Sequence, residues 1–397
     1  MLACVIVNST WRDEIAMIIE RKQFTKQIKD AFEQFSVCGI LGPRQCGKTT
    51  LAHDFSKANF EKVYLFDLED PSHLDQLQNP KAALDPLSGL IIIDEIQRKP
   101  DLFPYLRVLS DYSDKKFLIL GSASVDLLRQ ASESLTGRID YLELTPFNVG
   151  EVEDLQKHWC QGGFPRSYLA TSYTNSLKWR KNYVSGFIER DLRSIEIQLN
   201  AATMRQLWML IAHYHGQILN YSDIGRSLGT SDMTIRRYIN ILSQTFMIRL
   251  LQPWHENISK RQIKAPKIYM RDTGLLHATL NIQENDWYAH PVRGASFEGY
   301  IIEELIRKFG QECEYYFWRT HTGDELDLLV IKDGKRYGFE VKLADAPEVT
   351  KSMHVALNDL KLEHLYIVTM SDRIYQKVDK ISVLGAKCIA DWKGCDA

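Results

Sequence analysis

The sequence predicts an α/β protein of several domains, with a parallel sheet first, a mainly helical middle and a second α/β region last. Three observations support this class. The apolar runs Val37–Leu41, Leu90–Ile93 and Phe117–Leu120 are typical of strands buried on both faces. Residues 156–272 are expected to be mainly helical, and strand-like segments, including a hairpin with period-two alternation, follow after residue 314. With 397 residues the chain is longer than one hydrophobic core usually holds.

The composition is that of a globular protein. Hydrophobic residues make up 45% and charged residues 25%, and 49 basic side chains stand against 51 acidic ones for a net charge of -2. Disordered, collagen-like and coiled-coil chains are excluded, and no apolar run reaches the roughly 18 to 20 residues of a membrane-spanning helix. The first residues lack the features of a signal peptide, and the seven cysteines show no zinc spacing. We therefore expect a cytoplasmic protein without a membrane partner.

A complete phosphate-binding motif follows the first apolar strand. Residues 42–49 fit the pattern G-x-x-x-x-G-K-[ST] and lead into a helix-like segment. In this motif the glycines let backbone N–H groups surround a phosphate, Lys48 reaches the β and γ phosphates, and Thr49 holds Mg²⁺. The predicted nucleotide-binding residues are Gly42, Pro43, Arg44, Gln45, Cys46, Gly47, Lys48, Thr49 and Thr50.

The strand Leu90–Ile93 ends in two acids that read as a Walker B motif. Asp94 is predicted to hold Mg²⁺ and Glu95 to orient or deprotonate the attacking water, whereas an ordinary strand could end in acids that cap a helix. After the next strand, Ser122 is a candidate sensor of the γ-phosphate, although turn chemistry alone also explains its surroundings.

An arginine precedes the expected strand Ile139–Leu144. Arg138 could approach the γ-phosphate within its own chain or from a neighbouring subunit, as arginine fingers do, or it could be an ordinary solvated arginine. The second arrangement would require a homo-oligomer.

These elements resemble the P-loop domain of AAA+ ATPases, in the sub-family of prokaryotic proteins that carry a C-terminal nuclease-like domain of unknown function. The resemblance extends over residues 17 to 370 and rests on the motifs above together with residues 135–138, 144–147 and 162–165. It implies ATP and Mg²⁺ as ligands. It also implies a P-loop domain over 17–155, an N-terminal extension over 1–16 and a helical connector over 156–200.

Residues 201–272 are expected to form a winged helix. From Ala201 to Lys267 nine basic side chains stand against three acidic ones, and two short helices, Ser222–Leu228 and Asp232–Ile239, flank a Gly-Thr-Ser turn. Wing strands are expected around a basic loop. Such a module binds DNA or simply packs as an interface. The candidate nucleic-acid ligands are Thr234, Arg236, Arg237, Lys260, Arg261 and Lys264.

Near the C-terminal end, a two-residue turn allows side-chain positions to be derived from spacing. Asp333-Gly334 favours a hairpin in which Lys332 pairs with Lys335, so Asp327 falls opposite Glu340 and Glu325 opposite Lys342. Opposed carboxylates repel each other unless a proton, a lysine or a metal ion lies between them. Oxygen ligands of this kind suit Mg²⁺ or Mn²⁺.

This region, residues 273–397, resembles the PD-(D/E)xK nuclease superfamily, whose restriction-endonuclease-like core has the order α-β-β-β-α-β. The resemblance implies Glu298, Asp327 and Glu340 as metal ligands and Lys342 as a catalytic lysine. Silent nucleic-acid binding and a structural role remain alternatives. The whole chain is therefore predicted to be an ATPase that controls a DNA-binding, nuclease-like region. The alternatives are an ATP-licensed nuclease and a nucleotide-gated binding or defence switch with little turnover.

Overall fold

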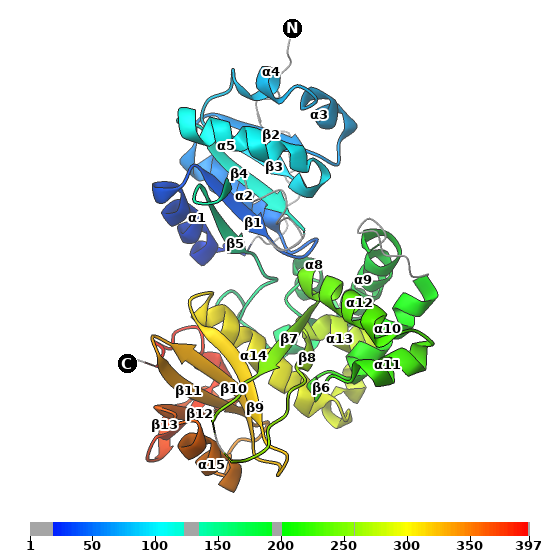
Figure 1. Ribbon diagram of the computed structural model, residues 1–397, viewed down its shortest axis with the longest axis vertical. Helices are drawn as coiled ribbons and strands as arrows, with labels where there is room; N and C mark the ends of the chain where they lie inside the picture. Colours follow the sequence, from blue (N-terminus) through cyan, green and yellow to red (C-terminus); the bar gives the residue numbers. More distant parts are fainter. Residues whose placement is uncertain (1–18, 123–134, 193–200, 258, 396–397) are drawn as a thin grey trace. The chain divides into compact units, whose positions relative to one another are not determined.

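The computed structural model describes residues 19–122, 135–192, 201–257 and 259–395, so the predicted extension 1–16 lies outside the described residues. The chain divides into two compact units (Figure 1). The first ends at Pro146 and also includes Gln244–Phe246, and the second contains Phe147–Ser243 and Met247 onward. Among the helices that the structure describes, none is long and apolar enough to cross a membrane.

The first unit is built on a five-stranded parallel sheet with the strand order β2-β3-β4-β1-β5, which confirms the predicted parallel sheet. The strands are β1 (Val37–Leu41), β2 (Val63–Asp67), β3 (Leu90–Asp94), β4 (Lys116–Gly121) and β5 (Ile139–Glu143). The helices are α1 (Lys22–Gln34), α2 (Lys48–Asn59), α3 (Pro71–Gln76), α4 (Pro80–Leu84) and α5 (Phe103–Tyr112).

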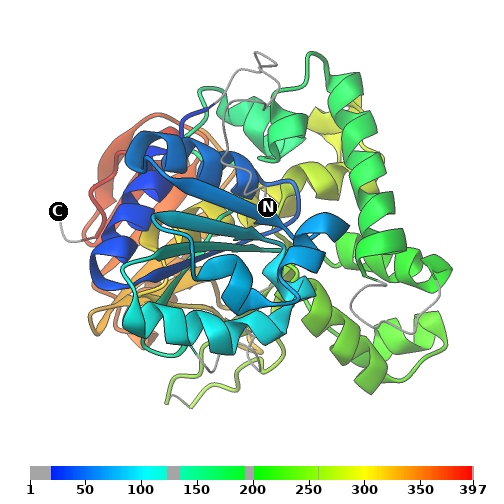
Figure 2. The same ribbon diagram turned by 90° about the horizontal axis from the view of Figure 1, so that it is seen from above.

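Helices cover both faces of this sheet (Figure 2). On one face, Ile91, Ile93 and Phe117 pack against Phe103 and Leu106 of α5. Helices α1 and α2 lie on the other face and contact each other through the rings of Phe32 and Phe55, whose centroids are 6.0 Å apart. Because successive strand residues point to opposite faces, burial on both faces requires the uninterrupted apolar runs seen in the sequence.

Because the strands are parallel, the motifs lie together at one end of the sheet, where the strands have their C-terminal ends. Leu41, the last residue of β1, pairs with Gly121 of β4, and Asp94 at the end of β3 pairs with Asp67 of β2. The phosphate-binding loop, the Walker B acids and Ser122 therefore follow neighbouring strand ends. At the other end of the sheet, where the strands begin, Ile139 of β5 pairs with Val37, the first residue of β1.

The second unit begins with helices and ends with a large sheet. Its helices are α7 (Leu155–Gln161), α8 (Pro165–Tyr168), α9 (Tyr173–Gly186), the π-helical turn Phe187–Asp191, α10 (Ala201–His213), α11 (Tyr221–Leu228), α12 (Asp232–Gln244), α13 (Thr273–Thr279), α14 (Arg293–Phe309) and α15 (Lys351–Asp359). Its strands are β6 (Gln217–Ile218), β7 (Ile248–Pro253), β8 (Lys267–Met270), β9 (Glu314–Arg319), β10 (Glu325–Lys332), β11 (Lys335–Val341), β12 (His364–Thr369), β13 (Ile374–Val378) and β14 (Ile381–Gly385).

All nine strands form one sheet in the order β13-β14-β12-β11-β10-β9-β7-β8-β6. The middle of the chain contributes β6, β7 and β8, and the C-terminal region contributes the rest. They join where Gln252 and Pro253 of β7 pair in parallel with Tyr316 and Phe317 of β9. Residues on both sides of position 272 thus belong to the same sheet.

The hairpin register predicted from Asp333-Gly334 is confirmed. Both turn residues have positive φ, 50° and 76°, as a two-residue turn of this kind requires. Lys332 pairs with Lys335, and the ladder runs to the pair Leu328 and Phe339. The helix, three strands, helix and strand expected for this region are observed as α14, β9, β10, β11, α15 and β12.

The segment Gly162–Pro165 passes α13 at very short range. A Cβ atom on Gly274 would lie 2.1 Å from the carbonyl oxygen of Gln161, and one on Gly163 would lie 2.4 Å from that of Phe147. The buried carboxylate of Asp272 accepts hydrogen bonds from the backbone N–H of Gly163, at 2.8 Å, and from the first turn of α13. Glycines are therefore required here by close backbone contact.

Three buried histidines should make the second unit sensitive to acid. Burial lowers the pKa of His158 and His215 to about 4 and that of His277 to about 3, from an ordinary value of 6.5. The unfolded chain takes up these protons below pH 6.5 and the folded chain does so only near pH 4. Stability is therefore present above pH 6.5 and is lost as the pH falls toward 4, by about 3 kcal/mol for each histidine.

Urea unfolding at pH 7 and pH 5 tests this expectation, and the midpoint should fall at the lower pH. His215→Asn should flatten the pH dependence, whereas His321→Asn, a substitution at an exposed position, should leave it unchanged. Equal midpoints at the two pH values would contradict the assignment.

Candidate functional site

The phosphate-binding loop connects β1 to α2. Gln45 and Gly47 have φ values of 60° and 103°, and α2 begins directly afterwards at Lys48. A Cβ atom on Gly42 would lie 2.1 Å from the carbonyl oxygen of Leu144, so only glycine fits at the start of the loop. The loop thus leaves β1, turns sharply and presents the N-terminal N–H groups of a 12-residue helix, which suits a phosphate.

The two nucleotide-binding motifs meet at Thr49. Its hydroxyl donates a 2.7 Å hydrogen bond to the carboxylate of Asp94, and burial raises the pKa of that carboxyl. The ammonium group of Lys48 donates to the carbonyl oxygens of Gly42 and Pro43, at 3.0 Å each. A hydroxyl and a carboxylate in contact, with a lysine folded into the adjacent loop, fit Mg²⁺ and a triphosphate.

The second Walker B acid, Glu95, is held by two neighbours. Its φ is 55°, and its carboxylate accepts hydrogen bonds from Gln97 and, at 3.0 Å, from the hydroxyl of Ser122. Gln97 also donates to Ser122 at 2.9 Å. Ser122, predicted as a γ-phosphate sensor, thus contacts Glu95. Gln97 belongs to the stretch Asp94–Gln97 that carries the family resemblance, but no role was predicted for it.

We expect Ser122→Ala to impair turnover and not nucleotide affinity. The substitution removes a hydrogen bond to Glu95, worth about 1 kcal/mol, which corresponds to a fall in kcat of about fivefold. Steady-state phosphate release should show a lower kcat at an unchanged KM for ATP. Ser110→Ala on α5 is the control, because the hydroxyl of Ser110 donates to the carbonyl oxygen of Arg107 in the same helix. A rise in KM with unchanged kcat would instead indicate direct contact with the nucleotide.

Two arginines of this unit are paired with acids. Arg44 of the loop lies 2.5 Å from Glu69. Arg138, just before β5, donates two hydrogen bonds to the carboxylate of Asp111, from Nε at 2.5 Å and from Nη2 at 3.1 Å. Arg138 precedes the N-terminal end of β5, whereas the phosphate-binding loop follows the C-terminal end of the neighbouring strand β1. Arg138 therefore does not lie beside the loop of its own chain. A role from a neighbouring subunit stays a prediction.

An acidic cluster in the second unit contains the residues predicted for a nuclease-like site, and a buried lysine lies among them. The Nζ atom of Lys267 on β8 lies 2.9 Å from Glu298 of α14, 2.6 Å from Glu325 and 4.0 Å from Asp327. Glu340 pairs with Lys342 at 2.9 Å. Glu325, expected opposite Lys342, instead pairs with Lys267 and, at 3.6 Å, with Arg319. The ladder of β10 with β11 ends at Leu328 and Phe339, before it reaches Glu325, and a β-bulge shifts the pairing of β10 with β9 between Leu326 and Leu329.

Burial and repulsion dominate the protonation of this cluster. Burial, Glu340 and Glu298 together raise the pKa of Asp327 well above its ordinary value. Burial opposes the charge of Lys267, but the facing acids and Tyr269 outweigh it and raise its pKa. No group of three His, Cys, Asp or Glu side chains within the described ranges is arranged to hold a metal ion. Because the ammonium group of Lys267 lies among Glu298, Glu325 and Asp327, the cluster as folded does not fit the predicted second Mg²⁺ or Mn²⁺.

The sequence did not single out Lys267, which it placed among the basic residues of the middle region. Its one local signal is that it begins the otherwise apolar strand Lys267–Met270, all four residues of which are buried. Tyr269, two residues along the same strand, donates a 2.5 Å hydrogen bond to Glu298.

The candidate nucleic-acid ligands have different surroundings. Arg236 and Arg237 are exposed on α12, and the guanidinium of Arg236 lies 3.9 Å from the ring centroid of Tyr221. Thr234 is half-buried and its hydroxyl contacts Ser231. Lys260 forms ion pairs with Asp324, at 3.3 Å, and Asp359, at 2.8 Å. Arg261 and Lys264 are exposed.

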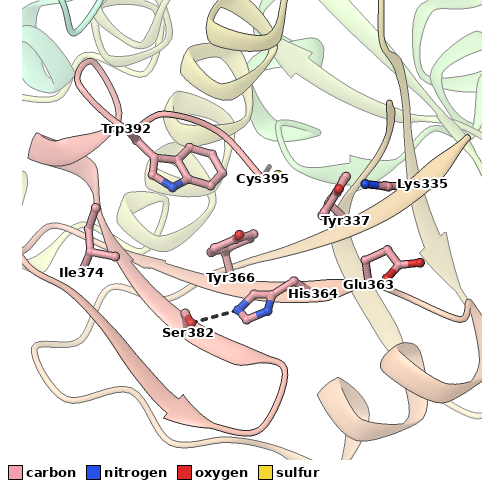
Figure 3. Close-up of a pocket in the computed structure, with 9 residues that line it drawn as sticks. All are labelled: Lys335, Tyr337, Glu363, His364, Tyr366, Ile374, Ser382, Trp392 and Cys395. Atoms are coloured by element: carbon pink, nitrogen blue, oxygen red, sulfur yellow. Dashed lines mark hydrogen bonds between the residues drawn. The ribbon is translucent and has the colours of Figure 1, made fainter. Parts of the chain in front are cut away.

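A half-open hollow of about 570 Å³ lies elsewhere on the C-terminal region (Figure 3). Tyr337 of β11 lines it, and because side chains alternate along a strand, Tyr337 and Glu340 point to opposite faces. The ring of Tyr366 packs against those of His364 and Trp392, with centroids 4.6 and 4.9 Å away. The hollow is thus separate from the acidic cluster, and the aromatic side chains that line it pack against one another.

Three stretches of the chain match known domain families. Residues 34–153 match an AAA domain, residues 152–286 a domain of unknown function (DUF8612) and residues 293–389 another domain of unknown function (DUF4143). A solved structure described as the Walker-type ATPase PABY2304 of Pyrococcus abyssi is 14% identical, with a TM-score of 0.46 over 66% of this chain and 96% of that one.

Two proteins of known sequence are much more similar. The chain is 43% identical over 375 residues to the uncharacterized protein Rv2008c of Mycobacterium tuberculosis and to the uncharacterized protein Mb2031c of Mycobacterium bovis. Each match covers 93% of this chain and 84% of the relative. The AAA domain confirms the predicted P-loop ATPase class and, at the level of the family, a nucleotide ligand. The chain therefore belongs to the family of the mycobacterial proteins Rv2008c and Mb2031c, with an AAA-type P-loop ATPase domain in its first unit.

Proposed function

We propose that the protein hydrolyses Mg²⁺-ATP at the phosphate-binding loop and uses the cycle to control a winged helix and a nuclease-like region that act on DNA. The observation that carries the ATPase part is the 2.7 Å hydrogen bond between Thr49 and Asp94. It brings the residues of two separate motifs, 45 positions apart, to the place where Mg²⁺ would be held.

Each residue of this site has a role in the proposed reaction. Bound Mg²⁺ would neutralise phosphate charge, and Thr49 and Asp94 are the residues that would hold it. Lys48 offsets the charge that develops on the transferred phosphoryl group. Glu95 orients the attacking water and accepts its proton, and Ser122 and Gln97 position the carboxylate of Glu95. Arg138 of a neighbouring subunit would complete the charge compensation in a homo-oligomer.

The test is ATP hydrolysis by the full chain with and without single-stranded, duplex and branched DNA, followed by gel analysis of the same DNA. Stimulation by one DNA form supports the proposal and identifies the substrate class. Tightly retained nucleotide with negligible multiple turnover would favour a nucleotide-gated switch. Turnover that no DNA form alters would count against DNA as the partner.

The DNA-binding part of the proposal rests on α11 and α12. Two helices joined by a short turn, Gly229 having a φ of 62°, present Arg236 and Arg237 on an exposed face. Strands β7 and β8 follow them, as in a winged helix. Lys260 is a poorer candidate because two carboxylates already neutralise its charge.

We expect the double substitution Arg236→Gln, Arg237→Gln to lower the affinity for DNA and to make this affinity less dependent on salt concentration. Each lost phosphate contact should reduce the slope of log K against log salt concentration by about one, so the double variant should lose about two. Fluorescence anisotropy at several salt concentrations measures this slope. Arg205→Gln is the control, because Arg205 is paired with Glu189. An unchanged slope would remove α12 from the interface.

A second candidate function is DNA cleavage by the C-terminal region. It is supported by the hairpin register, whose ladder ends at Leu328 and Phe339, the residues next to Asp327 and Glu340. If ATP licenses this cleavage, incubation of DNA with ATP and Mg²⁺ or Mn²⁺ should give products that Asp327→Ala abolishes. Products that persist in Asp327→Ala would assign the cleavage to another site or to a contaminant.

A further inference from the structure

The ammonium group of Lys267 lies where the acidic cluster would have to receive a cation. It contacts Glu298 and Glu325 at hydrogen-bonding distance and has Asp327 at 4.0 Å. Its side chain is only 3% exposed, and the ring centroid of Phe317 lies 5.5 Å from Nζ. An ammonium group in these surroundings is held both by charge and by directed hydrogen bonds.

The sheet keeps the backbone of Lys267 in place. Strand β8 is paired on both sides, so that Lys267 stands opposite Ile218 of β6 and Leu251 of β7. A strand with two partners cannot shift without breaking two ladders. Withdrawal of the ammonium group would therefore require movement of the side chain, away from three acids and out of a buried site.

The cluster already contains nearly as many cations as carboxylates. Lys342 pairs with Glu340, and Arg319 lies 3.6 Å from Glu325. Together with Lys267 these side chains bring three positive charges to four carboxylates, those of Glu298, Glu325, Asp327 and Glu340. A divalent ion placed in this set would stand beside an ammonium group of like charge and would be repelled.

We propose that Lys267 takes the place of a divalent metal ion in the acidic cluster and thereby holds the C-terminal region in a form that neither binds metal nor cuts DNA. This inference rests on the proposed nuclease-like function and adds its regulation. Lys267 is a positioning residue, since it orders Glu298, Glu325 and Asp327 while excluding a competing cation. Cleavage by this region would thus require displacement of a lysine supplied by the middle of the chain.

The experiment is a titration with Mn²⁺ of the nucleotide-free full chain, followed by the electron paramagnetic resonance signal of the free ion. All variants carry Asp94→Asn, so that the phosphate-binding site does not contribute. We expect weak uptake by the chain with Lys267 present and at least about tenfold tighter binding in Lys267→Met. Adding Asp327→Asn to Lys267→Met should remove the gain. Lys260→Met is the matched control, because Lys260 also lies between two carboxylates.

Two results would overturn the inference. One is tight Mn²⁺ binding with Lys267 in place that Asp327→Asn abolishes, and this measurement does not depend on whether Lys267→Met folds. The other is a folded Lys267→Met that binds no better than Lys260→Met. DNA added to the same samples separates the two proposals. Metal binding by Lys267→Met without cleavage supports the role of Lys267 and contradicts the nuclease function.

Discussion

Lys48→Ala should reduce ATP turnover by about 10²- to 10³-fold. Phosphoryl transfer depends on charge compensation in a site that excludes water, and the loss of one such group typically has an effect of this size. The ammonium group now held by the carbonyl oxygens of Gly42 and Pro43 is the cation that the loop itself supplies. Phosphate release under saturating ATP and Mg²⁺ measures the effect.

The matched control for this prediction is Lys57→Ala. Lys57 lies on the same helix, α2, but is exposed in its last turn. It should retain full turnover, and both variants should melt at the same temperature as the unmodified protein. Turnover unaffected by Lys48→Ala would exclude the loop as the site of hydrolysis and with it the proposed function.

Gly274→Ala should destabilise the second unit by about 3 kcal/mol, although alanine is the better helix former by about 1 kcal/mol. The added methyl group would lie 2.1 Å from the carbonyl oxygen of Gln161 and 2.6 Å from the backbone nitrogen of Gly162. Both are backbone atoms, so the segment Gly162–Pro165 would have to move away from α13. Thermal unfolding, monitored by circular dichroism, reports the loss.

Gly294→Ala tests whether the effect comes from this contact. Gly294 occupies the second position of α14, as Gly274 does in α13, but a Cβ atom there would have no neighbour within 4 Å. The control should therefore be neutral or stabilising by up to about 1 kcal/mol. Equal effects of the two substitutions would show that helix propensity, and not the crossing of the two segments, determines the outcome.

Local features of the sequence were sufficient to predict where the phosphate-binding loop and the Walker B acids lie in the sheet. The residues of the loop are contiguous, and parallel strands necessarily bring the strand ends at Leu41, Asp94 and Gly121 to one edge. The hairpin register was predictable for the same reason, because Asp333 and Gly334 alone determine how the two strands pair.

The surroundings of the predicted residues were not predictable, because their partners are distant in sequence. Lys267 contacts Glu298, 31 positions away, and Arg138 contacts Asp111, 27 positions away. Such pairs arise from the arrangement of whole elements. The β-bulge that shifts the pairing of β10 with β9 between Leu326 and Leu329 also has no signal in the pattern of residues. The ladder that Asp333-Gly334 begins ends at Leu328 and Phe339, before it reaches Glu325.

The parallel pairing of β7 with β9 limits where a protease can cut this protein, and where recombination can join parts of its relatives, without exposing a strand edge. A break after Asp272 would not release two finished domains, since it would leave each fragment with a bare strand edge, and such edges pair with other chains. The two regions that match separate domain families thus contribute three and six strands to one sheet. Relatives should be able to exchange their C-terminal regions only when β7 and β9 are inherited together.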